Sequence, residues 1–271
     1  MTTSLFSAIV LAGERSPGQN KVALEAKTPC KSLAPVNGRP MVLRVIEALE
    51  KSGSVNRVIL SGPQESIIKQ SPELQNIIDQ GRVEWFPPQA SPSTSTAYIL
   101  QQLPEDEPVL LTTSDHALLS PSMVDFFCAQ TASSTNDVSA GMATKDTVYQ
   151  TYPQTKRTLW SWQDGTFCSC NLFAFWTSKG RTAADFWRKI EAKRKNPLKM
   201  LQIFGLSLAI RYFLGILTSK ECLKQVSKQM GVKASIIVLP FAEAALDIDS
   251  IDDWLLIESI AQHTDKNCYY R

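Results

Sequence analysis

The feature that most constrains the fold is a short, continuously apolar run near the N-terminus, Ser7–Ala12, which stops at Gly13. A strand that is apolar at every position is typical of a parallel sheet covered by helices on both faces. No positive residue precedes the run, and Glu14 and Arg15 follow it at once. We therefore expect a buried strand here and not the core of a signal peptide.

The same kind of pattern continues along the first half of the chain. Further apolar strands are predicted at Arg57–Leu60 and Val109–Thr113. Helices are predicted to begin at Pro40 and at Pro121, where Ser120 is the expected N-cap. Strands that alternate with helices predict an α/β, Rossmann-like fold with a mostly parallel sheet flanked by helices. In such sheets ligands bind beyond the carboxyl ends of the strands.

The second half of the sequence is less regular. We expect it to complete a single domain over residues 1–271, with a helical insertion at about 178–231. The elements expected there are antiparallel strands within Tyr149–Trp176, a basic helix over Ser178–Lys195, an apolar segment at Leu198–Leu217, a helix at Ser219–Gly231, a strand at Ile236–Leu239 and a closing helix at Ser250–Ile260.

Composition narrows the class of protein. A net charge of +2 argues against a dedicated nucleic-acid binder, which usually carries a concentrated basic face, so no nucleic-acid partner is expected. Of the six cysteines only Cys168 and Cys170 lie close together, and two histidines are too few to complete a zinc site. We therefore expect the cysteines to be reduced thiols and the protein to be cytoplasmic.

Two stretches predict a phosphate-binding loop, "AIVLAGERSPG" and "CKSLAPVNGRPM". Gly13 allows a tight turn after the strand, so that backbone N–H groups can face phosphate oxygens. Arg15 and Lys31 would add positive charge where a triphosphate lies. An ordinary surface loop is the alternative that these residues alone leave open.

A second motif, "SPSTSTAYILQQL", places the hydroxyl side chains of Ser93, Thr94 and Ser95 before a predicted helix. Hydroxyls and free N–H groups at a helix N-terminus suit phosphate oxygens or base edges. An ordinary capped helix explains the same residues equally well.

Carboxylates predict a cation site at the same edge of the sheet. Asp115 follows the strand in "PVLLTTSDHALLSP", where it can hold a hard cation. In "ALDIDSIDDWLLIE", Asp247 and Asp249 alternate along an extended segment, so we expect only one of them, Asp247, to face the metal. Ser250 and Asp253 in the same motif predict a helix cap.

In this order the motifs resemble the MobA-like NTP transferases, a family similar to the sugar-phosphate and methylerythritol-phosphate cytidylyltransferases. The resemblance implies a GT-A-like fold and transfer of a nucleoside monophosphate from an NTP to a small phosphorylated acceptor, with Mg²⁺ as cofactor and pyrophosphate as product. It implies Lys31, Arg15 and Asp115 as catalytic residues, and Asp115 and Asp247 as metal ligands. Nucleotide contacts are expected from Leu11, Ala12, Gly13, Glu14, Arg15, Lys31, Ser93, Thr94 and Ser95, and acceptor contacts from Asn171 in "CSCNLFAF" and from Arg157.

The sequence departs from the family pattern at Glu14, which stands where the family has its second glycine. A non-catalytic nucleotide-binding homologue is therefore one alternative. A GT-A-type glycosyltransferase is another, although such an enzyme normally shows Asp-x-Asp at the central metal strand, where this chain has Ser114-Asp115-His116.

The apolar segment Leu198–Leu217 contains only Lys199 and Arg211 as charged residues, and Arg211 interrupts the run before it reaches the length of a membrane span. A helix that is apolar all round has to be buried. We expect burial in the fold or in a homodimer interface. Peripheral membrane contact is the alternative, because five basic residues precede the segment: Arg188, Lys189, Lys193, Arg194 and Lys195.

Overall fold

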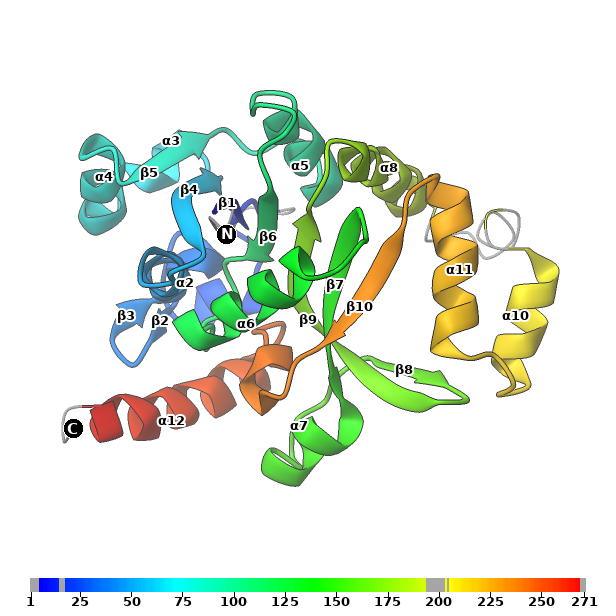
Figure 1. Ribbon diagram of the computed structural model, residues 1–271. Coiled ribbons are helices and arrows are strands. Elements are labelled where there is room, and N and C mark those ends of the chain that lie inside the picture. The colour runs from blue at the N-terminus through cyan, green and yellow to red at the C-terminus, as the bar shows by residue number, and fades with distance from the viewer. Residues whose placement is uncertain (1–4, 15–17, 194–202, 204, 269–271) are drawn as a thin grey trace.

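The structure, a computed structural model, describes residues 5–14, 18–193, 203 and 205–268 (Figure 1). Its central sheet has the strand order β10-β7-β9-β6-β1-β4-β5, with β8 beside β9. The strands are β1 (Phe6–Leu11), β4 (Val55–Ser61), β5 (Val83–Phe86), β6 (Val109–Thr113), β7 (Val138–Thr144), β8 (Leu159–Trp162), β9 (Gly165–Phe175) and β10 (Ala234–Val238). A separate small hairpin joins β2 (Pro35–Val36) to β3 (Arg39–Pro40).

The sheet is mostly parallel, as the sequence predicts. Strand β1 pairs in parallel with β4 and β6, β4 with β5, and β7 with β10, whereas β9 is antiparallel to β6, β7 and β8. The α-helices are α1 (Lys21–Glu25), α2 (Met41–Glu50), α3 (Glu65–Ile68), α4 (Pro72–Asp79), α5 (Pro92–Leu100), α6 (Pro121–Ala132), α7 (Lys145–Thr151), α8 (Ala183–Lys193), α10 (Leu206–Phe213), α11 (Ser219–Met230) and α12 (Ile251–Cys268). Short 3₁₀ helices are η1 (Lys31–Leu33), η2 (Lys179–Thr182) and η3 (Ala242–Ala245).

Both faces of the sheet are covered, which explains the continuous apolar run of β1. Ala8 and Val10 point into a core shared with α2 and α6, whereas Ile9 points into a second core shared with α5 and α8. All three side chains are fully buried. A strand in this position cannot alternate between apolar and polar residues, because neither face meets water.

Some elements differ from the prediction. Pro40 is the N-cap of α2 and not its first helical residue. Strands β5 and β7 have no counterpart among the predicted elements, because "VEWF" is very short and "VSAGMAT" carries few of the residues that favour strands. The predicted antiparallel strands of Tyr149–Trp176 are present as β8 and β9.

The described residues of the expected insertion are helical, but α10 is not buried in the fold as expected. It has no buried side chain, and Leu206 and Phe213 are 63% and 86% exposed. Gly205 and Gly215, both with positive φ, flank this short helix. Its exposed apolar residues, Leu206, Ile210 and Phe213, form one stripe. Residues 194–202 and 204 lie outside the described part. No described helix has the length and apolar character that crossing a membrane requires.

Candidate nucleotide and metal site

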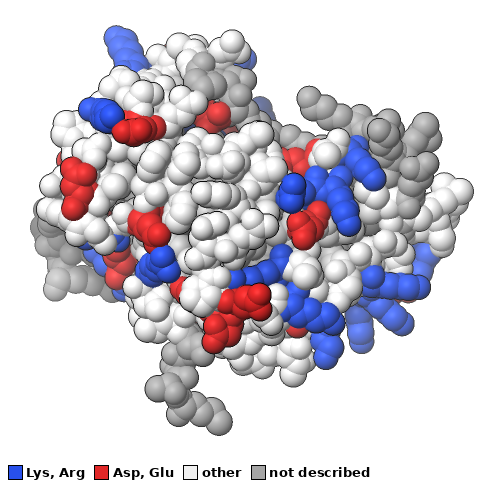
Figure 2. All heavy atoms as spheres, turned by 90° about the horizontal axis from the view of Figure 1, so that it is seen from above, with Lys and Arg blue, Asp and Glu red and all other residues white. Residues whose placement is uncertain are grey.

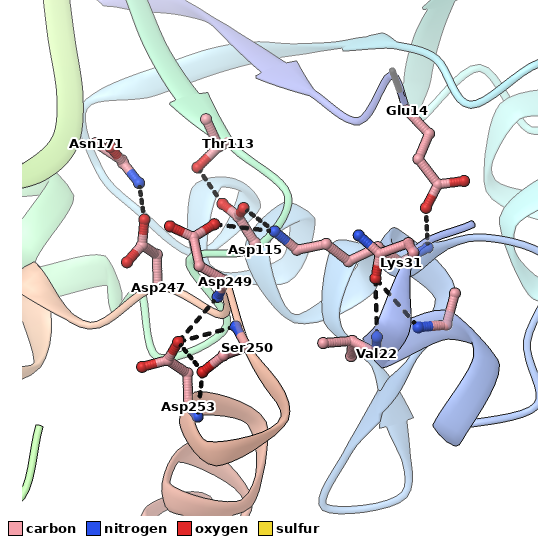
Figure 3. Close-up of polar contacts among 12 residues, drawn as sticks. Glu14, Val22, Lys31, Thr113, Asp115, Asn171, Asp247, Asp249, Ser250 and Asp253 are labelled. Atoms are coloured by element: carbon pink, nitrogen blue, oxygen red, sulfur yellow. Dashed lines mark hydrogen bonds and ion pairs between the residues drawn. The ribbon is translucent and has the colours of Figure 1, made fainter. Parts of the chain in front are cut away.

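Three carboxylates meet at the carboxyl edge of the sheet (Figure 3). Asp115 follows β6, whereas Asp247 and Asp249 lie in the segment between η3 and α12. One oxygen of each carboxylate lies within 4.8 Å of the others. The expectation that only one of Asp247 and Asp249 faces the site is therefore wrong. The segment is not a regular strand, because the Ile248 N–H donates to the Asp115 carbonyl at 3.1 Å and the chain turns around it.

Asp247 is held by neighbours from two parts of the chain, strand β9 and the loop before β8. The Asn171 side-chain amide donates to it at 2.7 Å, and Arg157 forms an ion pair with it. Asn171 has a φ of 49° at an irregularity in the pairing of β7 with β9, and such a bulge redirects the side chain. Burial, together with the charges of Asp115 and Asp249, raises the pKa of Asp247 to about 6.

Lys31, from η1, reaches into the carboxylate cluster. Its Nζ lies 2.6 Å from Asp115 Oδ2 and 3.4 Å from Asp249 Oδ1. Burial alone would raise the pKa of Asp115, but the Lys31 ammonium and a 2.5 Å hydrogen bond from the Thr113 hydroxyl lower it overall. Burial likewise opposes the charge of Lys31, yet the neighbouring carboxylates keep its pKa raised. Each group is therefore charged at neutral pH, and the ammonium offsets part of the negative charge of the cluster.

Arg157 lies behind the cluster and is only 7% exposed. Its guanidinium forms ion pairs with both Asp247 and Asp253, and donates to the Asp247 carbonyl at 2.9 Å. Asp253 in turn accepts from the Ser250 N–H at 2.9 Å, and the Ser250 hydroxyl accepts from the Asp253 N–H at 3.2 Å, which is the cap that the sequence predicts. Arg157 thus ties the Asp247 segment to the first turn of α12.

The predicted phosphate loop lies beside this cluster. Glu14 accepts a hydrogen bond from the Lys31 backbone N–H at 2.9 Å, and its second carboxylate oxygen is buried without a partner among the described residues. A Cβ built on Gly62, whose φ is 82°, would lie 2.9 Å from the Gly13 nitrogen. The two loops can approach this closely only because Gly62 has no side chain. Arg15 lies outside the described residues.

The hydroxyl-rich motif lies inside the first turns of α5 and not before the helix. Ser91 is the N-cap, and Thr94 forms a capping box with it. The Ser95 hydroxyl accepts from the Gln89 N–H at 2.9 Å. The Ser93 N–H donates to Glu191 of α8 at 3.2 Å, so a carboxylate of the insertion occupies the helix end that favours anions.

Two cavities follow from this arrangement. A small one of about 40 Å³ is lined by residues of the Gly13 loop and the start of α5, including Leu11, Glu14 and Ser95. A larger, open groove of about 790 Å³ lies between α5 and α8 and is lined by Ser93 and Thr94 together with Arg188 and Lys189. Ser91, the N-cap of α5, lines both cavities, so the two motifs meet at the start of this helix.

Sequence reasoning missed several residues of this site. Thr113 gave no signal beyond its place at the end of a strand, although a hydroxyl two residues before a metal-binding aspartate can orient it. Gly62 could have been found as a glycine directly after the strand next to β1. Glu191 had no detectable signal, because its contact with α5 spans 98 residues of sequence.

Comparison with known proteins fits this geometry. Residues 8–188 match the MobA-like NTP transferase domain. The chain belongs to this family. No curated protein sequence matches the chain significantly. The structure is similar to a hypothetical transferase from Thermus thermophilus, with 26% identity and a TM-score of 0.76 over 92% of this chain and 99% of that one.

Two other solved structures share the fold of this MobA-like protein. One is 4-diphosphocytidyl-2C-methyl-D-erythritol synthase from Anaerococcus prevotii, with 12% identity and a TM-score of 0.53 over 96% of this chain and 97% of that one. The other is CMP:2-keto-3-deoxy-manno-octonic acid synthetase in complex with CTP, with 10% identity and a TM-score of 0.54 over 97% of this chain and all of that one. The expected fold class is therefore confirmed, and the family places the chain among the nucleotidyltransferases.

Proposed function

We propose that this protein transfers a nucleoside monophosphate from an NTP to a small phosphorylated acceptor, in a Mg²⁺-dependent reaction that releases pyrophosphate. The observation that carries the proposal is the cluster of Asp115, Asp247 and Asp249, with Lys31 2.6 Å from Asp115, beside the Gly13 loop. Carboxylates for a cation and a lysine for phosphates are what nucleotidyl transfer needs at one place.

The residues of the cluster fit Mg²⁺. This ion is held by carboxylate oxygens and keeps further positions for water and substrate phosphates. The raised pKa of Asp247 reflects burial first and then repulsion from Asp115 and Asp249, and a divalent ion would relieve that repulsion. When bound, Mg²⁺ would neutralise charge that builds up on the phosphates during the reaction.

Lys31 has two roles in this proposal. Its ammonium forms ion pairs with Asp115 and Asp249 and so offsets their charge. It would also contact the triphosphate and stabilise the leaving pyrophosphate. Arg15 would add charge at the same phosphates from the adjoining loop.

The chemical step needs positioning more than a general base. An oxygen of the acceptor phosphate forms a bond to the α-phosphorus, and the bond from that phosphorus to the α–β bridging oxygen breaks. The electron pair of the broken bond leaves with pyrophosphate. Asn171 lies beside Asp247 and is proposed to contact the acceptor. The two ion pairs of Arg157 favour a positioning role for this residue over direct contact with an acceptor phosphate.

Glu14 favours a second candidate function, that of a nucleotide-binding protein without catalytic activity. Its carboxylate brings negative charge into the loop that would wrap the triphosphate. Against this, Glu14 bonds the Lys31 backbone and so helps to hold η1 in place.

Pyrophosphate release separates these functions. The purified protein would be incubated with each of the four NTPs and with panels of phosphorylated sugars, polyols and cofactor precursors, with Mg²⁺ and with chelator. Pyrophosphate that depends on NTP, acceptor and Mg²⁺ together supports the proposal. Binding of Mg²⁺–NTP without product from any acceptor supports the non-catalytic candidate, and turnover of a nucleotide-sugar supports a glycosyltransferase.

We also propose a cytoplasmic protein that reaches an anionic membrane surface through α10. Cys30, Cys128, Cys168, Cys170 and Cys222 are free, as in proteins of reducing compartments. Exposed Leu206, Ile210 and Phe213 form an apolar stripe on α10. The neighbouring α11 carries exposed lysines four residues apart, Lys220, Lys224 and Lys228. On the face seen in Figure 2, Lys and Arg side chains gather on the side that carries these helices, a distribution that favours a bilayer over a second copy of the chain.

A further inference from the structure

Described residues line a third cavity, partly open to solvent, which the proposed reaction does not use. Its volume is about 330 Å³, and it lies between the sheet and helices α8 and α11. This volume is at the lower end of the range of about 300–1,000 Å³ that is usual for ligand pockets. Contiguous apolar surface that is open to solvent marks a binding site, so this cavity calls for an apolar occupant.

The walls of this cavity are apolar. Among the lining side chains, the polar groups are the hydroxyls of Ser139 and Ser235 and the indole N–H of Trp187. The two hydroxyls hydrogen-bond to each other between β7 and β10 at 2.9 Å. Small side chains such as Ala140 and Ala183 leave the space open. Phe173 and Trp187 stack across it at 6.5 Å between ring centroids, which joins β9 to α8. Such a cavity favours hydrocarbon and offers nothing to a sugar or polyol.

The cavity adjoins the metal site along two strands. Leu111 of β6 and Phe173 of β9 are directly paired, and both line it. Two residues further along β6, or about 7 Å, Thr113 donates to the carboxylate of Asp115. Two residues before Phe173, Asn171 donates to that of Asp247. The residues that line the cavity are therefore only two positions along each strand from residues that contact the carboxylate cluster.

From this geometry we infer that the acceptor is a phosphomonoester with a hydrocarbon chain, whose chain occupies the cavity while its phosphate lies at the carboxylate cluster. The inference rests on the proposed function for the role of the phosphate, and on the cavity for the chain. It narrows the acceptor class from phosphorylated sugars and polyols to phosphates of apolar alcohols.

The test is a chain-length series. Ethyl, butyl, hexyl and octyl phosphate would be titrated by calorimetry into the full-length protein with Mg²⁺, below their micellar concentrations. We expect affinity to rise about fourfold per added methylene, the ratio that about 0.8 kcal/mol per buried CH₂ gives, until the cavity is full. A flat series would overturn the inference. Equal binding of 1-octanol and octyl phosphate would also overturn it, because the phosphate would then have no site.

Two variants fill the cavity from opposite walls, Ala140→Leu on β7 and Ala183→Leu on α8. Both should remove the chain-length trend and leave Mg²⁺–NTP binding unchanged, whereas Ala129→Leu on the exposed surface of α6 should change neither. Thermal unfolding checks that each variant folds, and two independent variants guard against one that does not. Retention of the full trend in both folded variants would place the chain elsewhere and overturn the inference.

The same titrations keep the two proposals apart. A protein that fails to bind Mg²⁺–NTP but retains the chain-length trend would contradict the proposed function. It would still support a hydrocarbon ligand in the cavity. Normal Mg²⁺–NTP binding with a flat trend would contradict only the inference about the cavity.

Discussion

The two halves of the sheet, one around β1 and β6 and the other beneath α8 and α11, differ in how tightly they are packed. Strands β1 and β6 are buried except at their last residues, and Gly62 has no room for a Cβ against Gly13. Beneath α8 and α11 the same sheet leaves a cavity of about 330 Å³, and the adjoining α10 exposes an apolar stripe. The first half presents charged groups at fixed positions, as catalysis requires. The second half leaves room and apolar surface, as binding of a variable or apolar partner requires.

The largest effect on turnover is expected from the tightly packed half, around β1 and β6. We expect Asp115→Asn to lower turnover at least a hundredfold, equivalent to about 2.7 kcal/mol of barrier, because it removes a charge from the proposed metal site without changing shape. The fold should persist, as judged by circular dichroism and thermal unfolding. Asp79→Asn, an exposed carboxylate on α4, is the matched control and should be silent. Retention of more than a tenth of wild-type turnover would exclude Asp115 as a metal ligand.

Lys31→Ala should have the next largest effect. We expect kcat/KM to fall about 30-fold, or about 2 kcal/mol, near the lower end of what losing one preorganised charged contact costs. Lys51→Ala, at the exposed end of α2, is the control. Arg15→Ala should cost less. The family pattern has its arginine late in this loop, whereas Arg15 stands early in it. An unchanged kcat/KM in Lys31→Ala would remove this lysine from the phosphate site.

Metal binding should depend on pH through Asp247. Since its pKa is raised to about 6, the carboxyl group is protonated below that pH and cannot ligate. The affinity for Mn²⁺, used alone as a probe, should therefore be constant above about pH 7 and fall about tenfold per unit below pH 6. Asp247→Asn should bind more weakly and lose this slope. A wild-type affinity that stays level between pH 5 and 7 would contradict the assignment.

The smallest effect on turnover is expected from the half that carries α8, α10 and α11. Replacing Ile210 and Phe213 by Ser on α10 should change turnover of soluble substrates less than twofold but abolish pelleting with anionic liposomes. Ser207→Ala, exposed on the same helix, is the control. Neutralising Lys220, Lys224 and Lys228 should weaken pelleting about fivefold per lysine at low salt. A salt-insensitive dimer with no pelleting would show instead that the stripe is a subunit interface.

The sequence by itself determined the elements whose signal is local. The apolar run Ser7–Ala12 predicts β1, because a strand buried on both faces needs apolar residues throughout. The end of β6 was predicted to the residue, and with it the position of Asp115 at the carboxyl edge. The Ser250–Asp253 helix cap could likewise be predicted from the sequence, since it depends on two residues three positions apart.

Only the tertiary structure decided the features that join distant parts of the chain. It brings Asp249 together with Asp247 and Asp115, because the chain turns around a backbone hydrogen bond that no strand periodicity describes. It pairs Glu191 with the start of α5, and it leaves the stripe of α10 exposed although the composition of Leu198–Leu217 predicted burial. Composition shows that a segment is apolar, but whether that surface is covered depends on whether another layer is placed against it.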